Sequence, residues 1–212
     1  MRFVSVYKKD IFAAALIGFI VGVSLIFIFK NIELEVPFIG FAPLVLSFLS
    51  VIGIAIAAWI GKKVPVLFQA AKFALVGVLN TMIDLGVLNV LMFASGIAGG
   101  LYFSLFKAVS FLLGVTNSYF WNKFWTFKSK KEVRAIEFIE FVAIAGVGFI
   151  INVGVARFIV NTIEPQFGMG ERVWANAGAI MAALSGMSWN FLGYKYIVFR
   201  KKDKKLDGEK AS

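Results

Sequence analysis

The chain has 212 residues, of which 60% are hydrophobic and 16% charged, and its 22 Lys and Arg against 12 Asp and Glu give a formal net charge of +10. A soluble domain of this length is closer to half apolar and carries about 25% charged residues, so most of this chain is expected to lie in lipid. The sequence contains no Cys and no His. This excludes disulfides and thiolate chemistry, and it removes the commonest metal ligand and general base.

Six apolar stretches are long enough to cross a bilayer as helices, because a span needs about 20 mainly apolar residues. The first of them is longer than a signal-peptide core and is followed by no small-residue cleavage site, so we interpret it as a retained helix. None has the short alternating period of a membrane-barrel strand. The sequence therefore predicts an all-α membrane protein with six transmembrane helices, at approximately residues 11–29, 40–60, 73–95, 101–122, 138–162 and 174–198.

The basic residues gather on one side of this predicted topology. Of the 22 Lys and Arg, 18 fall at the N-terminus, in the second and fourth connections, or at the C-terminal end. The second connection, residues 61–72, is expected to hold Lys62, Lys63 and Lys72. By the positive-inside rule, we expect a multi-pass protein of the cytoplasmic membrane with both termini in the cytoplasm.

The first two predicted helices have faces of small residues and no charge in their interiors. Gly18 and Gly22 form a small-xxx-small pair, which lets helices approach closely. We expect the two helices to pack on each other, with self-association of the chain into a homo-oligomer as the alternative. The predicted organisation is an N-terminal transmembrane helix pair at 1–65, a four-helix domain at 66–200 and a basic cytoplasmic tail at 201–212.

The four later helices contain a parallel two-helix repeat with little sequence identity. Residues 114–127 align without gaps with residues 186–199, so that Lys123 matches Lys195. The helix before each of these stretches carries a Gly followed three or four residues later by an Asn. Repeats of this kind occur in transporters, where binding sites often lie at the repeat interface.

Small and polar residues at helical spacing form one face of each of these four helices. Their most prominent members are Asn80, Asn117, Asn152 and Asn190. Two interpretations stay open for these amides. They either hold neighbouring helices together or line a hydrated groove that binds a polar ligand.

Asp84, Lys107 and Arg157 are charged residues that fall well inside predicted spans, away from the predicted cytoplasmic ends. An ionised group at the bilayer centre costs at least about 2.5–3.5 kcal/mol, so it usually pairs or lines a polar path. The long side chains of Lys107 and Arg157 could snorkel outward, whereas Asp84 is too short to do so from mid-span. We expect Asp84 to face the bundle interior and to pair with Lys107 or Arg157, in a structural role or as part of a pathway.

Aromatic, amide and lysine side chains meet at the predicted cytoplasmic ends of the fourth and sixth helices. Trp, Tyr and Lys are common helix anchors at the headgroup level. The repeat-related Lys123 and Lys195 could instead hold a lipid phosphate, because basic pockets on this side bind anionic headgroups. Both interpretations stay open.

The segments FALVGVLNT at 73–81 and SYFWNKFWTF at 118–127 resemble the GtrA-like proteins, and the resemblance extends over about residues 67–200. This family is a small four-helix membrane module. It is associated with moving polyprenyl-phosphate-linked sugars across the membrane or with assisting the glycosyltransferase that makes them, and similar modules are fused to polyprenyl-phosphate mannose synthases. By resemblance, the family-motif positions are Asn80, Asn122, Lys123 and Trp125, while the helix pair at 1–65 is an addition to the usual four helices.

The resemblance implies a membrane translocase, or flippase, of polyprenyl-phosphate-linked sugar in cell-surface polysaccharide synthesis or glycosylation. The alternative is a non-transporting membrane partner that recruits or orients a polyprenyl-phosphate glycosyltransferase. An enzyme is not expected, because acid–base chemistry needs a placed titratable group, and neither a metal nor a cofactor is expected. The expected partners are the lipid-linked sugar, anionic lipids and a membrane glycosyltransferase, with no nucleic acid. The candidate substrate-binding residues are Asn80, Asp84, Lys107, Asn117, Asn122, Lys123, Trp125, Asn152, Arg157, Asn190, Tyr194 and Lys195.

Overall fold

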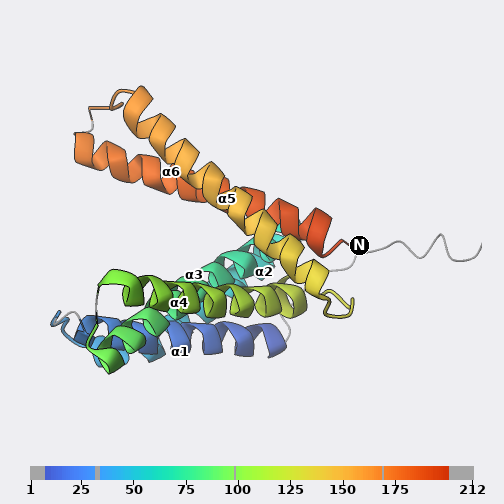
Figure 1. The fold of residues 1–212 in the computed structure, drawn as a ribbon. Coiled ribbons are helices and arrows are strands. Elements are labelled where there is room, and N and C mark those ends of the chain that lie inside the picture. Colours follow the sequence, from blue (N-terminus) through green and yellow to red (C-terminus); the bar gives the residue numbers. More distant parts are fainter. Residues whose placement is uncertain (1–7, 32–33, 98, 169, 201–212) are drawn as a thin grey trace, which may run out of the picture. The chain divides into compact units, whose positions relative to one another are not determined.

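The computed structural model describes residues 8–31, 34–97, 99–168 and 170–200, and in these ranges it contains helices and no strands (Figure 1). The prediction of an all-α protein with six long helices is confirmed. The predicted tail at 201–212 lies outside the described residues. The helices are α1 (Lys8–Asn31), α2 (Ala42–Gly61), α3 (Pro65–Ser95), α4 (Gly100–Trp121), α5 (Ala135–Thr162) and α6 (Glu171–Gly193).

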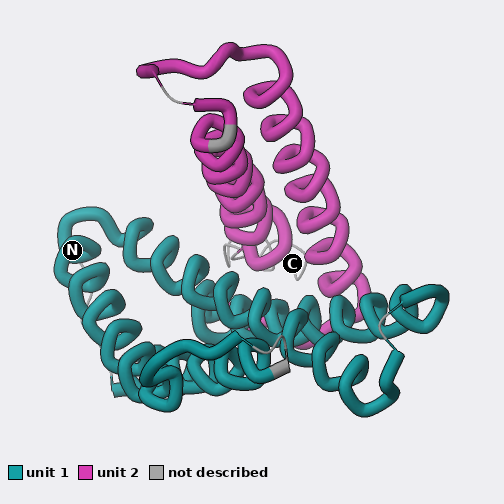
Figure 2. Tube along the Cα trace, turned by 90° about the vertical axis from the view of Figure 1, so that its left-hand side faces the viewer, with its two compact units in different colours: residues 1–128 teal, residues 129–212 magenta. Residues whose placement is uncertain are grey.

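Three short helical segments complete the fold. A single 3-10 turn, η1 (Ile39–Phe41), precedes α2. Two π-helical turns, η2 (Asn122–Thr126) and η3 (Tyr194–Val198), follow α4 and α6 directly. The chain divides into two compact units, residues 1–128 and 129–212, which are shown in separate colours in Figure 2.

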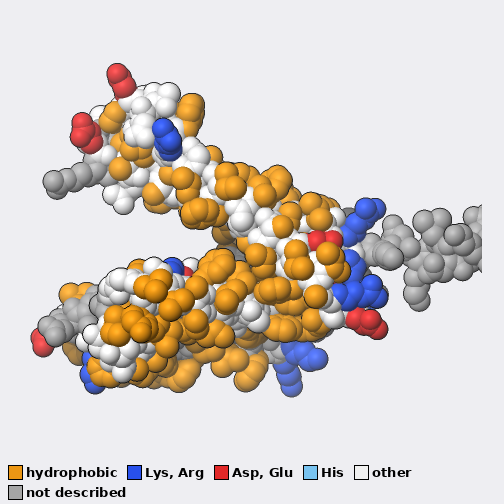
Figure 3. All heavy atoms as spheres, viewed as in Figure 1, with side chains coloured by type: hydrophobic (Ala, Val, Ile, Leu, Met, Phe, Trp, Pro, Cys, Tyr) orange, Lys and Arg blue, Asp and Glu red, His pale blue; other side chains and the backbone are white. Residues whose placement is uncertain are grey.

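Among the residues that the structure describes, five helical segments are long and apolar enough to cross a membrane: Lys8–Lys30, Ile39–Gly61, Pro65–Ser95, Gly100–Thr126 and Ala135–Thr162. They agree with the first five predicted spans. Helix α6 is not among them, and its sequence includes Asn176, Ser185, Ser188 and Asn190, so a sixth span stays a prediction. Apolar side chains cover much of the visible surface of each unit (Figure 3), as expected where the surrounding solvent is lipid.

In unit 1, α1 packs on α2 and α3, and α3 also packs on α4. The approach of α1 to α2 depends on its two glycines, because a Cβ at Gly18 would overlap the backbone of Leu46 and one at Gly22 the backbone of Pro43. The hydroxyl of Ser47 donates a 2.9 Å hydrogen bond to the carbonyl of Ala15. The predicted packing of the first two helices is therefore confirmed.

Helix α3 begins eight residues before the expected start of the third span. Pro65 occupies its first turn, where the fixed φ of proline favours helix initiation and its missing N–H costs nothing. The connection from α2 is therefore only Lys62 to Val64. The expectation that Lys72 lies in this connection is wrong, because Lys72 is inside α3 and only 2% exposed.

Unit 2 is built on the pairing of α5 with α6. The backbones approach closely at their glycines: a Cβ at Gly186 would lie 2.7 Å from the carbonyl oxygen of Gly148. At one end of the pair, the indole of Trp174 donates a 2.9 Å hydrogen bond to the carbonyl of Ile163. Toward the other end, the rings of Phe141 and Tyr194 stack with centroids 4.0 Å apart.

Candidate functional site

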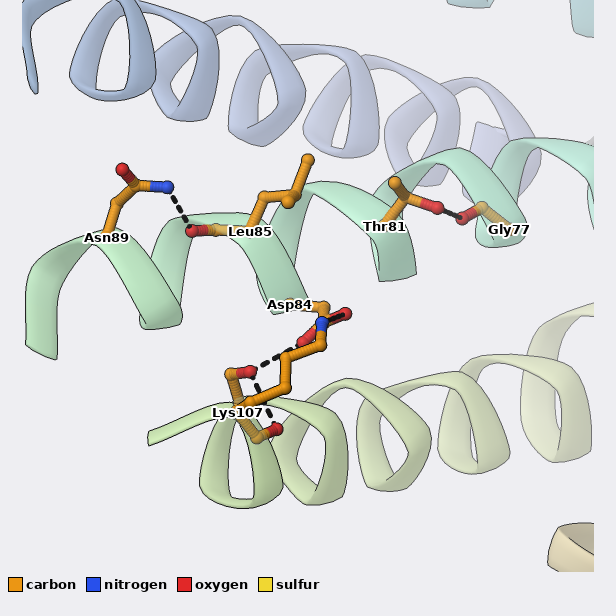
Figure 4. A network of polar contacts seen from close by, with 7 residues as sticks. Gly77, Thr81, Asp84, Leu85, Asn89 and Lys107 are labelled. Atoms are coloured by element: carbon orange, nitrogen blue, oxygen red, sulfur yellow. Dashed lines mark hydrogen bonds and ion pairs between the residues drawn. The ribbon is translucent and has the colours of Figure 1, made fainter. Parts of the chain in front are cut away.

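An ion pair joins α3 to α4 within their candidate spans. Lys107 Nζ lies 2.5 Å from Asp84 Oδ2, and the hydroxyl of Ser110 donates a 2.6 Å hydrogen bond to Asp84 Oδ1. Figure 4 shows Lys107 of α4 reaching across to Asp84 of α3. Of the two partners expected for Asp84, the structure has Lys107. The pair is partly accessible, because the Lys107 side chain is 44% exposed and that of Asp84 is 22% exposed.

The polar side chains next to this ion pair divide into two groups. Thr81 and Asn89 return their hydrogen bonds to their own helix, at the carbonyls of Gly77 and Leu85 (Figure 4). By contrast, the buried amide atoms Asn80 Oδ1 and Asn117 Nδ2 have no hydrogen-bond partner among the described residues. One hydrogen-bond acceptor and one donor are therefore unpartnered, among the described residues, on the same two helices that carry the ion pair.

Asn80 also sets the distance between α3 and α4. A Cβ placed on Gly114 would lie 3.1 Å from Asn80 Oδ1, so the small residue on α4 leaves room for the amide of α3. This arrangement supports both interpretations of the amide, because the same side chain packs between helices and presents an unpartnered oxygen.

Three of the four family-motif positions, Asn122, Lys123 and Trp125, lie in the π-helical turn η2, while Asn80 lies in α3. Its defining hydrogen bond runs from the N–H of Phe127 to the carbonyl of Asn122, at 2.9 Å. Turns of this kind are rare and are often found at functional sites. Lys123 is fully buried rather than placed on a surface, and its ammonium lies 5.7 Å from the ring centre of Tyr119.

The two other polar side chains of this turn are incompletely bonded. The amide nitrogen of Asn122 donates a 2.9 Å hydrogen bond to the carbonyl of Ser118. In the described part of the chain, no hydrogen bond reaches Asn122 Oδ1 or Thr126 Oγ1, although both residues are buried. The turn thus contains side-chain hydrogen-bonding groups that its own packing leaves unsatisfied.

A second ion pair, buried in unit 1, connects α1 to this motif. The ammonium of Lys72 on α3 pairs with Asp10 Oδ1 on α1, and Trp125 Nε1 of η2 donates a 3.0 Å hydrogen bond to the same oxygen. Asp10 and Lys72 are 1% and 2% exposed. The Lys72 ammonium also lies 4.4 Å from the ring centre of Phe68 and 5.1 Å from that of Trp125.

The residues expected in the second repeat come together on α5, α6 and η3. The side chain of Asn190 contacts Gly148, and Asn152 Cβ lies 3.2 Å from the position of a Cβ on Gly186. Asn190 Oδ1 is buried and has no hydrogen-bond partner in the described residues. Tyr194 begins the turn η3, whose hydrogen bond from the N–H of Phe199 to Tyr194 measures 2.8 Å.

Lys195 and Arg157 differ from the buried lysine of the first repeat. Lys195 is half-buried, with its ammonium 5.5 Å from the ring centre of Phe191 and 5.3 Å from that of Tyr196. Arg157 is exposed on α5 and makes no ion pair with another described residue. Asp84 and Arg157 belong to different compact units, so their proximity stays a prediction.

The sequence reasoning missed three residues of these sites. Ser110 was not proposed as a partner of Asp84. Lys72 was counted with the charges that set the topology, and Asp10 was not singled out. A carboxylate just before a long apolar run was the available signal for Asp10, but such a position is also typical of the membrane interface.

The fold and these sites define a multi-pass helical membrane protein with charged groups inside its candidate spans. A family model described as the GtrA/DPMS transmembrane domain matches residues 72–205. Because the match covers more than half of the chain, this protein belongs to the GtrA/DPMS transmembrane domain family. The family is implicated in the translocation of polyprenyl-linked sugars, and its members are in general not catalytic.

The chain is also 29% identical over 130 residues to a protein of Bacillus subtilis (strain 168) named uncharacterized membrane protein YngA, a match that covers 60% of this chain and 77% of that protein. No solved structure matches the chain. The matched family region begins at Lys72, so α1 and α2 lie outside it.

Proposed function

We propose that this protein is a translocase of polyprenyl-phosphate-linked sugars in the cytoplasmic membrane, with both termini on the cytoplasmic side. The cargo combines an anionic phosphate, a polar sugar and a long apolar tail. Its passage needs a cation and hydrogen-bonding groups within the membrane, next to an apolar surface for the tail. The membership of the GtrA/DPMS family supports this choice of cargo.

The observation that carries the proposal is the accessible ion pair of Asp84 and Lys107. Lys serves phosphate as a point charge, and Asp84 keeps Lys107 paired while no cargo is present. A phosphate that reaches Lys107 replaces the carboxylate as its counter-ion, and Ser110 continues to hydrogen-bond Asp84. The Lys107 side chain is 44% exposed, so a phosphate can approach it without separation of α3 from α4.

The unpartnered amides supply the second part of the site. Asn80 Oδ1 and Asn117 Nδ2 have the opposite hydrogen-bonding capacities that a sugar hydroxyl satisfies. A protein that only recruits a glycosyltransferase needs neither these groups nor a charge inside the membrane. Such a partner would be expected to work through its exposed cytoplasmic charges instead.

Reconstitution in liposomes tests the proposal directly. Vesicles that contain the full chain should move a labelled undecaprenyl-phosphate-linked sugar between leaflets faster than empty vesicles do. The variant Lys107→Met should lower this rate at least about tenfold, because removal of one partner of a charge-assisted contact commonly costs 1.4 kcal/mol or more. Lys130→Met, which removes an exposed lysine outside the spans, serves as the matched control and should leave the rate unchanged.

Two outcomes would overturn the proposal. One is a transfer rate no higher than that of empty vesicles for several lipid-linked sugars. The other is equal activity of Lys107→Met and the wild-type protein. Co-purification with a polyprenyl-phosphate glycosyltransferase, combined with the absence of transfer, would identify the chain as a recruiting partner.

A further inference from the structure

We infer that Lys72 and Trp125 form a binding site for the phosphate group of a lipid, and that Asp10 of α1 occupies this site as a tethered competitor. The inference goes beyond the proposed function, because it concerns lipid binding and holds whether or not the chain moves the lipid. It assigns a role to α1, which lies outside the region that the family model matches.

The geometry of the cluster is that of an anion site. Two donors, the Lys72 ammonium and the Trp125 indole N–H, converge on one oxygen, Asp10 Oδ1. The three residues are 2%, 8% and 1% exposed, respectively. Charge-assisted hydrogen bonds of this kind are the strong ones in proteins, and phosphate oxygens accept them as carboxylate oxygens do.

The two donors belong to the family region, while the acceptor does not. Lys72 lies at the first residue of the matched region and Trp125 is a motif position, whereas Asp10 is on the added helix. The carboxylate of Asp10 thus comes from outside the family region, while both donors, on α3 and η2, lie within it. An external phosphate would find the same two donors if the carboxylate were withdrawn.

The place of Asp10 within α1 limits the change needed for its withdrawal to one helical turn. Asp10 lies in the first turn of the helix, and terminal turns open at far lower free energy than helix interiors do. The remainder of α1 is held independently, by buried Ala14 and Ile17 and by the contacts of Gly18 and Gly22 with α2. Unwinding one turn thus frees Lys72 and Trp125 without displacing the helix pair.

The surroundings favour a lipid phosphate as the external ligand. The cluster lies two turns from the start of α3, near the predicted cytoplasmic surface, where Lys62 and Lys63 precede the helix. Basic pockets between helices on this side of a membrane bind anionic headgroups. The exposed Lys128 close to the cluster adds further positive potential.

Native mass spectrometry of the full-length protein in detergent tests the inference, with undecaprenyl phosphate, phosphatidylglycerol and inorganic phosphate as probes. Asp10→Ala should bind undecaprenyl phosphate at least about tenfold more tightly than the wild type, because a competent state populated at 10% or less weakens the apparent affinity by that fraction. The double variant Asp10→Ala/Lys72→Met should lose this gain. Glu132→Ala, which removes an exposed acid elsewhere, is the matched control and should bind as the wild type does.

A gain with undecaprenyl phosphate alone would identify a phosphate monoester as the ligand, and a gain with both lipids a lipid phosphate in general. Either result supports the inference. If Asp10→Ala does not fold, Asp10→Asn keeps the shape of the side chain and carries the same expectation. The inference is overturned if neither variant binds lipid more tightly, if the gain persists without Lys72, if Glu132→Ala shows the same gain, or if only inorganic phosphate gains.

Discussion

The ion pair between α3 and α4 allows a quantitative prediction for the free energy of unfolding. Lys107→Met leaves Asp84 without its 2.5 Å partner inside a candidate span. A lone charge at this depth costs at least about 2.5–3.5 kcal/mol. Ser110 still donates a hydrogen bond to Asp84 Oδ1, so we expect a net loss of about 2 kcal/mol.

The double variant Asp84→Asn/Lys107→Met should recover most of this loss, because no unpaired charge is left. The cycle of two single variants and the double variant then gives a coupling of about 2 kcal/mol, well above the deviation from additivity of about 0.5 kcal/mol seen for independent sites. Equilibrium unfolding in mixed micelles with increasing SDS, followed by circular dichroism, measures each member of the cycle.

Arg157→Met is the matched control for this cycle. It removes a charge from a candidate span, but Arg157 forms no ion pair with another described residue. Its unfolding free energy should stay within about 0.5 kcal/mol of the wild type. Single variants that cost no more than this control, or costs that simply add in the double variant, would refute the account of Asp84 and Lys107 as a coupled pair.

Two further predictions concern unit 2. Gly186→Ala should destabilise the protein by about 1–3 kcal/mol, because the new Cβ would lie 2.7 Å from the carbonyl oxygen of Gly148; Gly154→Ala, which meets nothing within 4 Å, should instead stabilise it slightly through its higher helix propensity. If both variants changed the free energy of unfolding in the same direction in the SDS titration, the packing of α5 on α6 would be contradicted. Trp174→Phe should cost about 1 kcal/mol through loss of its indole hydrogen bond to Ile163, and no measurable loss would show that this bond does not contribute.

Features that depend on local periodicity were predictable from the sequence. The helices follow from runs of apolar residues about 20 long. The contact of α1 with α2 follows from two glycines four residues apart, Gly18 and Gly22. The partner of Asp84 could be narrowed to Lys107 or Arg157, because so few charges fall within the spans and an isolated one is unfavourable.

Features that depend on tertiary packing were not predictable. The bond from Trp125 to Asp10 joins residues 115 positions apart, and the pair of Lys72 with Asp10 joins residues 62 positions apart. Lys72 follows Lys62 and Lys63 closely, so the charge pattern assigns it to the connection, and only the early start of α3 at Pro65 carries it into the core. The π-helical turns were also unforeseen, since one extra residue in a turn leaves no periodic signal.

The role of the repeat-related lysines stays a prediction, because it too depends on tertiary packing. Lys123 and Lys195 match in sequence, yet Lys123 is fully buried against Tyr119 while Lys195 is half-buried. The sequence aligns the two positions but does not fix how far each side chain reaches toward the surface. The predicted boundary between a helix pair at 1–65 and a four-helix domain at 66–200 likewise stays a prediction.

The internal repeat bears on why the ion pair of Asp84 and Lys107 exists. Positions 72 residues apart share the packing elements of both helix pairs: Asn80 corresponds to Asn152, Gly114 to Gly186, and the turn η2 to η3. The counterparts of Asp84, Lys107 and Ser110, however, are Ala156, Ala179 and Ala182.

Helices α5 and α6 pack closely with these alanines in place. A helix pair of this fold therefore needs no ion pair in order to pack, and packing alone does not explain a charge cost of at least about 2.5 kcal/mol in α3 and α4. If the proposed function is correct, binding of the charged cargo to the first helix pair alone would explain it. Replacing Asp84, Lys107 and Ser110 together by alanine, the residues of the second repeat, should then preserve folding and abolish transfer of the lipid-linked sugar. If the triple variant is folded and fully active in liposomes, the ion pair is not needed for transfer and its role is structural.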